Sequence, residues 1–376
     1  MSASCWIGLL IAAFAGVSGV AAQDLPSKEI ETRQNLRDND DPPRWGYDPF
    51  NGRLLLGLAR QGLFGSQDGG ENWTRIDDGS YASTAADKPG LGPVVASPAK
   101  GVLFSLPYSQ GFTPILYRSL DAGRSWQPFL DGNRQLNAPS KPSSTEVVTA
   151  QALRLYFVRG RPQSMYLLTS WPYMHEEGAR WLGMRLWSSW DGGASFRRIT
   201  NYPGPEFFYD IDVTAGRICV AFWQEHDSSL KTIINREAVL CRRDGGDTWR
   251  EVAVAGPEVR KRTYYAFRIW TDNAGAFSVL AGDKLQVSTD DLKTFKSYAL
   301  PSGPKELFLH PLDVYPAYLS VQESEDRHVV YRLDKDQSVT KLGAIKGRRI
   351  LQVDFSQGLA LAEDYKERRF YRVELR

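Results

Sequence analysis

The sequence contains few of the residues from which metal and nucleophile sites are built. Its 376 residues include only 3 Cys and 4 His, and no zinc-type spacing, phosphate-binding Gly loop or nucleophile elbow occurs. Charge of one sign is also lacking, because 46 Lys and Arg against 44 Asp and Glu leave a net charge of +2. This balance argues against a nucleic-acid partner. We therefore expect no metal and no other cofactor.

Long hydrophobic runs are absent after the first residues. The stretch Trp6–Ala22 is apolar and rich in small residues, and Val20-Ala21-Ala22 suits cleavage by a signal peptidase before Gln23. A membrane anchor is the alternative, but a stable span needs about 20 strongly apolar residues. We expect residues 1–22 to be a signal peptide, cleaved near Ala22. The mature chain would then be exported, periplasmic or secreted, with no transmembrane segment.

Two cysteines remain in that mature chain. Cys219 and Cys241 both lie in apolar, strand-like stretches. An oxidising compartment permits a disulfide between neighbouring strands. Two buried free thiols are the alternative.

What the chain does contain is an internal repeat, among 33 Gly, 21 Pro and 12% aromatic residues. Ser66-Gln67-Asp68-Gly69-Gly70-Glu71-Asn72-Trp73 returns at Ser119–Trp126, Ser189–Phe196 and Arg242–Trp249. Weaker copies lie at Ser288–Phe295 and Arg332–Val339. Successive aspartates are 44 to 70 residues apart. This period is typical of a four-stranded propeller blade.

Each residue type in the repeat has a structural role in a hairpin turn. The Asp carboxylate can accept backbone N–H groups of the turn, and the following Gly permits positive φ. The closing Trp or Phe buries a large ring at the start of the next strand. We therefore interpret Asp68, Asp121, Asp191, Asp244 and Asp290 as structural rather than catalytic residues.

The repeat resembles the Asp box of BNR-repeat proteins, and the resemblance covers most of the mature chain. That family includes sialidases, sortilin-type receptors, xyloglucan-cleaving glycosidases and a photosystem assembly factor. The resemblance implies an all-β propeller whose Asp boxes lie at the blade periphery, away from the ligand site. It implies fold much more strongly than activity.

The spacing predicts a seven-bladed β-propeller, with six blades as the alternative. Residues 44–376 would form one propeller domain, and Arg53–Ala59 would be an inner strand of its first blade. The last blade shows three strands, so residues 23–43 are expected to supply a closing strand around Lys28–Arg33. The third blade is the longest, and Trp171–Gly178 is expected to be a surface loop.

Propellers bind ligands over the central channel, so polar and aromatic residues of the inner strands are the candidate site. Trp45 and Tyr156 fall on these strands, although packing between blades is the alternative for each residue. The ligand-binding candidates are Arg44, Tyr47, Arg154, Tyr209, Asp212, Tyr265, Arg268 and His310.

Two functions remain open. The first is a binding module for a protein or glycan partner, with exposed aromatics of the third blade, Trp171 and Tyr173, and Met174 as partner-binding candidates. The second is a glycoside hydrolase or lyase of sialidase-like type. The family resemblance implies a tyrosine nucleophile, a Glu partner and an Asp acid/base there. The candidates are Tyr209, Glu206 and Asp210.

The first blade favours the binding module. The Phe-Arg-Ile-Pro string of sialidases is absent from it. Its opening, Gly46–Ala59, instead resembles sortilin-type, xyloglucanase-type and assembly-factor propellers. Xyloglucanases need two tandem propellers, and a chain of this length supplies one.

Overall fold

A computed structural model describes the chain in segments. These are residues 23–30, 43–58, 60–81, 92–107, 116–130, 136, 151–158, 160–175, 178–199, 208–214, 216–225, 235–243, 246, 248–252, 267–364, 366 and 369–376. Only the backbone is described for residues 151–153, 170–175, 178–184, 208–209, 222–225 and 235–237.

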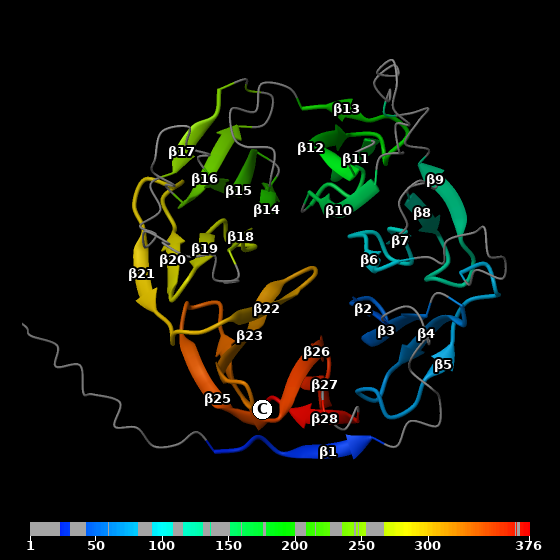
Figure 1. Ribbon diagram of the computed structural model, residues 1–376, viewed down its shortest axis with the longest axis vertical. Coiled ribbons are helices and arrows are strands. Elements are labelled where there is room, and N and C mark those ends of the chain that lie inside the picture. The colour runs from blue at the N-terminus through cyan, green and yellow to red at the C-terminus, as the bar shows by residue number, and fades with distance from the viewer. Residues whose placement is uncertain are drawn as a thin grey trace, which may run out of the picture.

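The described residues form seven antiparallel sheets of four strands each, arranged as a ring (Figure 1). The prediction of a seven-bladed, all-β propeller is confirmed, and the six-bladed alternative is wrong. Blade one consists of β2 (Arg44–Asp48), β3 (Arg53–Leu58), β4 (Gly62–Ser66) and β5 (Thr74–Arg75). Blade two consists of β6 (Val94–Ala96), β7 (Leu103–Ser105), β8 (Leu116–Ser119) and β9 (Gln127–Leu130). Blade three consists of β10 (Gln151–Phe157), β11 (Met165–His175), β12 (Gly178–Ser189) and β13 (Arg197–Arg198).

Blade four consists of β14 (Phe208–Thr214), β15 (Arg217–Glu225), β16 (Asn235–Arg243) and β17 (Arg250–Val252). Blade five consists of β18 (Arg268–Thr271), β19 (Phe277–Ala281), β20 (Lys284–Ser288) and β21 (Lys296–Ala299). Blade six consists of β22 (Lys305–His310), β23 (Val314–Ser324), β24 (Arg327–Leu333) and β25 (Val339–Lys346). Blade seven contains β26 (Arg348–Asp354), β27 (Leu359–Asp364), β28 (Phe370–Glu374) and β1 (Ser27–Ile30). The first strand named in each blade lies nearest the centre in Figure 1.

The N-terminal segment closes the ring. Strand β1 pairs antiparallel with β28 as the outermost strand of blade seven. Before it, Leu25 N donates to Ala344 O at 2.8 Å, and Ala344 N donates to Gln23 O at 2.9 Å. The segment thus covers the edge of β28 and also binds blade six, which removes two unpaired edges. The expected closing strand is confirmed, although it starts at Ser27, and residues 31–33 lie outside the described chain.

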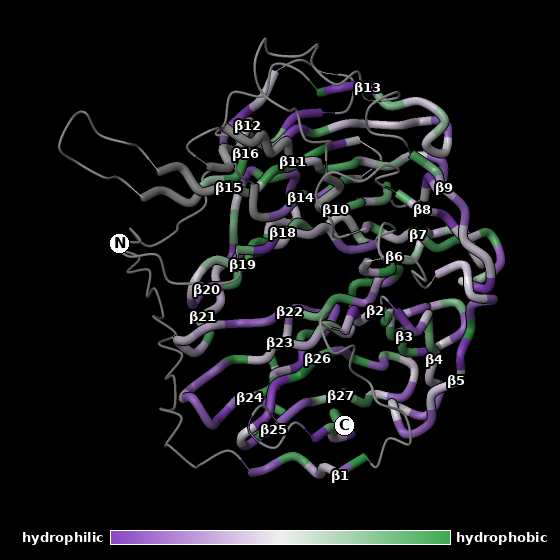
Figure 2. The backbone as a smooth tube through the Cα atoms, turned by 45° about the vertical axis from the view of Figure 1, so that its right-hand side comes forward, coloured by the Kyte–Doolittle hydropathy of each residue, from purple (hydrophilic) through white to green (hydrophobic). Residues whose placement is uncertain are grey.

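The core lies between neighbouring sheets. Leu116 and Phe104 of blade two pack with Leu155 and Leu167 of blade three, and corresponding clusters join the other blades. Figure 2 shows the outer strands β5 and β13 as hydrophilic, which matches their exposed Arg and Thr residues. Burial of apolar side chains between blades is the main favourable term for this architecture.

The repeated Asp turn connects the third and outermost strands of a blade. In blade one, Asn72 N donates to Asp68 Oδ1 at 2.9 Å, and Ser66 Oγ donates to the same oxygen at 2.7 Å. Trp73 Nε1 donates to Gly70 O at 2.9 Å. The turn places two successive residues at positive φ, here Gly69 and Gly70 at 72° and 100°. Asp121, Asp191 and Asp290 make the same contacts, and Asp244 lies outside the described chain.

Two details differ from the sequence expectation. The apolar run Arg53–Leu58 is the second strand of blade one, and β2 is the innermost. The reason is burial: β3 is covered by neighbours on both edges and both faces, whereas Arg44 and Trp45 of β2 stay partly exposed along the channel. Residues Trp171–His175 are not a loop, because β11 and β12 continue pairing out to His175 and Gly178.

Cys219 and Cys241 are joined by a disulfide. They face each other across β15 and β16 and are buried beneath blade four and blade five side chains, including Phe277 and Val279. No helix in the described part of the chain is long and apolar enough to cross a bilayer.

Candidate functional site

The channel has two distinguishable faces, which follow from strand direction. All seven innermost strands begin on one side, at residues such as Arg44, Arg268 and Lys305, which we call the start face. They end on the other, at residues such as Thr271 and Asp354, which we call the end face. The Asp turns lie on the end face, because Ser66 pairs with Leu54 near the end of β2.

A cavity of 480 Å³ occupies the channel between the innermost strands of blades two to six. Its walls are mainly apolar, and its size suits a ligand or a few side chains of a partner. Apolar lining residues are Val95, Leu155, Ile211, Val213, Trp270, Leu307, Leu309 and Leu312. Bulges in β14 and β22, at Tyr209 and Leu309, break the alternation of side chains along these strands. Bulges of this kind re-aim side chains, which helps successive residues reach the channel.

A second cavity, of 350 Å³, opens at the start face and is more polar. It is lined by Trp45, Arg268, Lys305, Glu306 and Arg349, among others. Burial lowers the pKa of Lys305, and burial raises the pKa of Glu306 while Arg349 opposes that shift. Arg268 and Leu307 line both cavities, so the two adjoin. The lining of this cavity therefore contains three basic side chains, Arg268, Lys305 and Arg349, and one carboxyl group, that of Glu306.

Asp210 lies at the centre of the charged residues in the channel. Its Oδ1 is 3.5 Å from Arg154 Nη1 and 3.6 Å from Arg268 Nη1, and its Oδ2 accepts the Ile269 N–H at 3.1 Å. Burial raises the pKa of Asp210, and the two arginines oppose that shift. Burial also raises the pKa of Tyr156, whose hydroxyl lies beside Arg154 and near Asp210. One Asp, one Tyr and two Arg thus meet where blades three, four and five adjoin.

Asp212 lies two residues after Asp210 on β14 and also contacts β18. Its Oδ1 accepts the Thr271 N–H at 2.9 Å, and the Thr271 hydroxyl donates to its other oxygen. The carboxylates of Asp210 and Asp212 therefore bind the edge of β18 where a paired strand would otherwise bind. Both oxygens of Asp212 and Oδ2 of Asp210 are thus used in this contact, whereas Oδ1 of Asp210 faces Arg154 and Arg268.

Three other predicted site residues occupy positions between blades. Arg44 begins β2 and lies near the buried Tyr81 hydroxyl. The Tyr47 hydroxyl accepts the Ser356 N–H at 3.1 Å, and its ring packs edge-on against His310 and Phe355. The Nδ1 atom of His310 accepts the Asp313 N–H at 3.0 Å, and burial lowers the pKa of His310.

The remaining candidates are only partly described. Glu206 and Tyr265 lie outside the described residues. Tyr209, Trp171, Tyr173 and Met174 are described by backbone alone, in β14 and β11. The proposed grouping of Tyr209, Glu206 and Asp210 therefore stays a prediction. The tyrosine that the described residues place beside Asp210 is Tyr156, from a different blade.

Lys305, Glu306 and Arg349 were not among the sequence candidates. The signal that identifies them is position, since each stands at the start of the innermost strand of blade six or seven. Within the described segments, no group of three or more His, Cys, Asp or Glu side chains is placed to hold a metal ion.

No family model matches this sequence, and comparison with curated proteins finds no match. Solved structures do resemble the fold. A structure of YCF48 bound to a D1 peptide is 10% identical, covers 96% of this chain and 99% of its own, and gives a TM-score of 0.50. The extracellular domain of a putative hybrid two-component system, BT3049 from B. thetaiotaomicron, is 13% identical over 93% of this chain and 42% of its own, with a TM-score of 0.50. A GH74 xyloglucanase from Xanthomonas campestris is 14% identical, covers 89% and 70%, and has a TM-score of only 0.31. At these identities the likeness concerns the propeller fold alone.

Proposed function

We propose that this chain is an exported β-propeller of the Asp-box type that binds an extended segment of a protein partner in its central channel. The observation that carries the proposal is the composition of that channel. A mainly apolar cavity of 480 Å³ adjoins a second cavity lined by three basic side chains, and Arg268 contributes to both. One bound segment can therefore bury apolar side chains inside and place polar groups at the mouth.

The state of the buried carboxylates supports binding over catalysis. Asp210 and Asp212 are both occupied by backbone and side-chain donors of blade five. Most glycosidases need two carboxyl groups that face the scissile bond and remain available to it, and sialidases replace one of them with a tyrosine. The YCF48 structure carries a bound peptide, which is compatible with a peptide ligand on this fold.

The binding experiment uses a fluorescent peptide library against the purified mature protein, read by anisotropy, beside a glycan array. We expect peptides with adjacent apolar residues to bind and the glycans not to bind. Leu309→Arg places a charge in the channel wall and should abolish binding. Leu120→Arg is the matched control, because Leu120 lies on an Asp turn and is 56% exposed. If a glycan binds the parent protein and Leu309→Arg abolishes that binding, the ligand of the channel is a saccharide and not a protein partner.

The export part of the proposal has its own test. The proposed signal peptide ends near Ala22, and Gln23 is the first residue of the segment that closes the ring. N-terminal sequencing of the protein recovered from the periplasm or medium should begin at Gln23. Recovery of an uncleaved, membrane-bound chain would contradict this part alone.

A hydrolase is the second candidate, favoured by the meeting of Tyr156, Arg154, Arg268 and Asp210 beside the channel cavity. Sialidase-type chemistry uses a tyrosine together with arginines that hold a carboxylate. The test is a screen on chromogenic glycosides with Tyr156→Phe and Tyr209→Phe. Turnover that either substitution abolishes would make the hydrolase the better description.

A further inference from the structure

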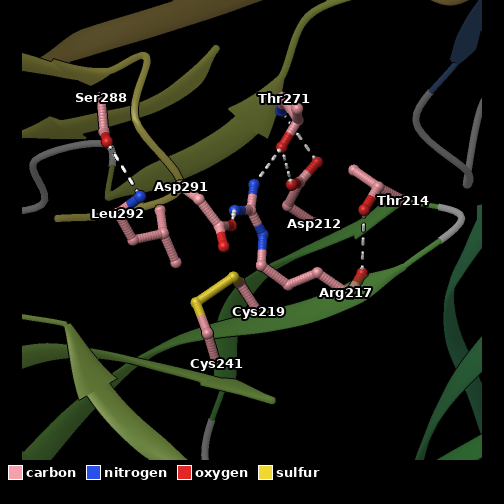
Figure 3. Close-up of a disulfide and its surroundings, with 9 residues drawn as sticks. All are labelled: Asp212, Thr214, Arg217, Cys219, Cys241, Thr271, Ser288, Asp291 and Leu292. Carbon is pink, nitrogen blue, oxygen red and sulfur yellow. Dashed lines mark hydrogen bonds and ion pairs between the residues drawn. A yellow bond between two sulfur atoms is a disulfide. The ribbon is translucent and has the colours of Figure 1, made fainter. Parts of the chain in front are cut away.

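A third cavity, of 580 Å³, lies on the end face over blades three to five, and we call it the end-face groove. Its wall is formed by turns between the first and second strands of these blades, at Gly160, Gly216 and Gly275. The other lining residues are Thr214, Arg217, Arg243, Thr271, Asp272, Asn273 and Asp291. Figure 3 shows Arg217 of this groove between Thr271 and Asp291, above the disulfide.

The glycine turns leave the groove open. A Cβ atom added at Gly160, Gly216 or Gly275 would meet nothing within 4 Å. The backbone of three separate turns is therefore uncovered around one hollow. A ligand chain can approach the backbone of these turns closely, because glycine has no Cβ atom to hold it away.

Two arginines and two aspartates line the groove, so their contacts decide which charged side chain is left to bind a ligand. Asp272 is buried and accepts the N–H groups of Ala274 and Ala276, both at 2.9 Å. Arg217 donates to Asp291 at 3.1 Å and to Thr271 Oγ1 at 3.2 Å, and its side chain is 13% exposed. Arg243 is exposed, and its side chain makes no hydrogen bond or ion pair within the described part of the chain, although its carbonyl accepts the Gly246 N–H at 3.1 Å.

The groove continues into the channel. Gly160 and Asn273 line both the end-face groove and the 480 Å³ channel cavity. A ligand that places an apolar side chain in the channel can therefore extend over these two residues toward Arg243. The two cavities differ in the residues that line them, since most residues of the channel cavity are apolar and those of the groove are glycine, polar or charged.

We propose that the end-face groove is a subsite for an acidic residue of the same bound peptide, with its carboxylate on Arg243 and adjacent to Arg217. This inference rests on the proposed function, because the channel supplies the apolar anchor. Charge-assisted hydrogen bonds from a guanidinium to a carboxylate give such a subsite its selectivity. Asp291 is already paired with Arg217 and competes with the ligand carboxylate for it.

The lining favours a peptide over an acidic saccharide. No residue that lines the groove is aromatic, so the described side chains offer no ring on which a sugar can stack. The adjoining channel cavity is mainly apolar, which suits Leu or Phe side chains. An acidic saccharide is an outcome that the test separates.

The test compares two labelled peptides on the full mature chain, Gly-Ser-Leu-Leu-Gly-Asp-Glu-Gly and its amide counterpart Gly-Ser-Leu-Leu-Gly-Asn-Gln-Gly. We expect the acidic peptide to bind about threefold to fivefold tighter at low salt, the size of an exposed ion pair. Arg243→Gln should remove that preference without changing binding of the amide peptide. Asp291→Asn should increase it, because Arg217 loses its internal partner. Arg198→Gln on the outer strand β13 is the charge-matched control and should change neither affinity.

The outcomes separate the two proposals. If neither peptide binds, or Leu309→Arg leaves binding intact, the channel-binding proposal fails and the subsite with it. If both peptides bind through the channel but with equal affinity, only the subsite is wrong. An acid preference that Arg349→Gln removes and Arg243→Gln does not would move the acidic residue to the start face. Binding of oligogalacturonate with the same Arg243 dependence would overturn the peptide assignment.

Discussion

Asp210 Oδ2 accepts the backbone N–H of Ile269 at 3.1 Å, and this bond connects blade four to blade five. Removing the side chain with Asp210→Ala leaves that N–H without its acceptor and leaves Arg154 and Arg268 without their shared anion. We expect a loss of about 2–3 kcal/mol in the free energy of unfolding, measured in urea. The expected loss is no larger because both arginine side chains are partly exposed, and solvent weakens their attraction to Asp210.

Two variants control this experiment. Asp210→Asn keeps an oxygen acceptor for Ile269 and loses only the charge, so its loss should be smaller. Asp326→Ala removes an aspartate from a surface pair with Lys366, and such pairs contribute about 1 kcal/mol or less. Equal effects of Asp210→Ala and Asp326→Ala would show that Asp210 does not tie the blades together.

Acid sensitivity should originate in the Asp turns. Hydrogen bonds from Ser195 and Thr294 lower the pKa of Asp191 and of Asp290 to about 2 from a usual 3.8. A depressed folded-state pKa means that this stabilisation is complete above pH 3.8 and is lost as the pH falls toward 2. In thermal unfolding scans between pH 5 and 2, the Asp191→Asn/Asp290→Asn variant should lose less stability with acid than the parent. Parallel curves for the two proteins would contradict this account.

The sequence predicts the blades well but does not show which side chains the ring brings together, for a physical reason. Each Asp turn is built from contiguous residues, such as Ser66 to Trp73, so its chemistry is visible along the chain. Asp210, Arg154 and Arg268 come from three different blades, and only closure of the ring brings them together. Their places on predicted inner strands make each of them a candidate, but do not show that they are partners.

The same limit applies to the aromatic residue beside Asp210. Proximity in sequence favours Tyr209, which stays a prediction, and closure of the ring also brings Tyr156 of blade three to Asp210. Lys305 and Arg349 were missed for a related reason. Their importance depends on standing at the start of innermost strands, and the sequence does not mark which strand of a blade is innermost.

The disulfide should contribute measurably to stability. Cys219 and Cys241 are separated by 22 residues and join two paired strands of blade four. Loop-closure entropy for a crosslink of this span is worth about 3 kcal/mol. Dithiothreitol should lower the melting temperature of the parent protein and leave that of Cys219→Ala/Cys241→Ala unchanged. An unchanged parent melting temperature, with reduction verified by thiol titration, would show that the crosslink adds nothing to stability.

The ring closure can be tested at one glycine. A Cβ atom at Gly343 would lie 2.7 Å from Gln23 O and 2.7 Å from Leu25 Cδ2, so Gly343→Ala must displace the N-terminal segment. Displacement loses the bonds at Ala344 and uncovers the outer edge of blades six and seven. We expect a loss of about 1–3 kcal/mol, typical of overpacking, together with faster proteolysis within residues 23–30. Gly216→Ala is the matched control, since a Cβ there meets nothing within 4 Å. Suppose that both substitutions are equally tolerated and the N-terminal segment stays protected from proteolysis. The segment then does not hold the ring closed, because a segment packed against Gly343 has no room for the added methyl group.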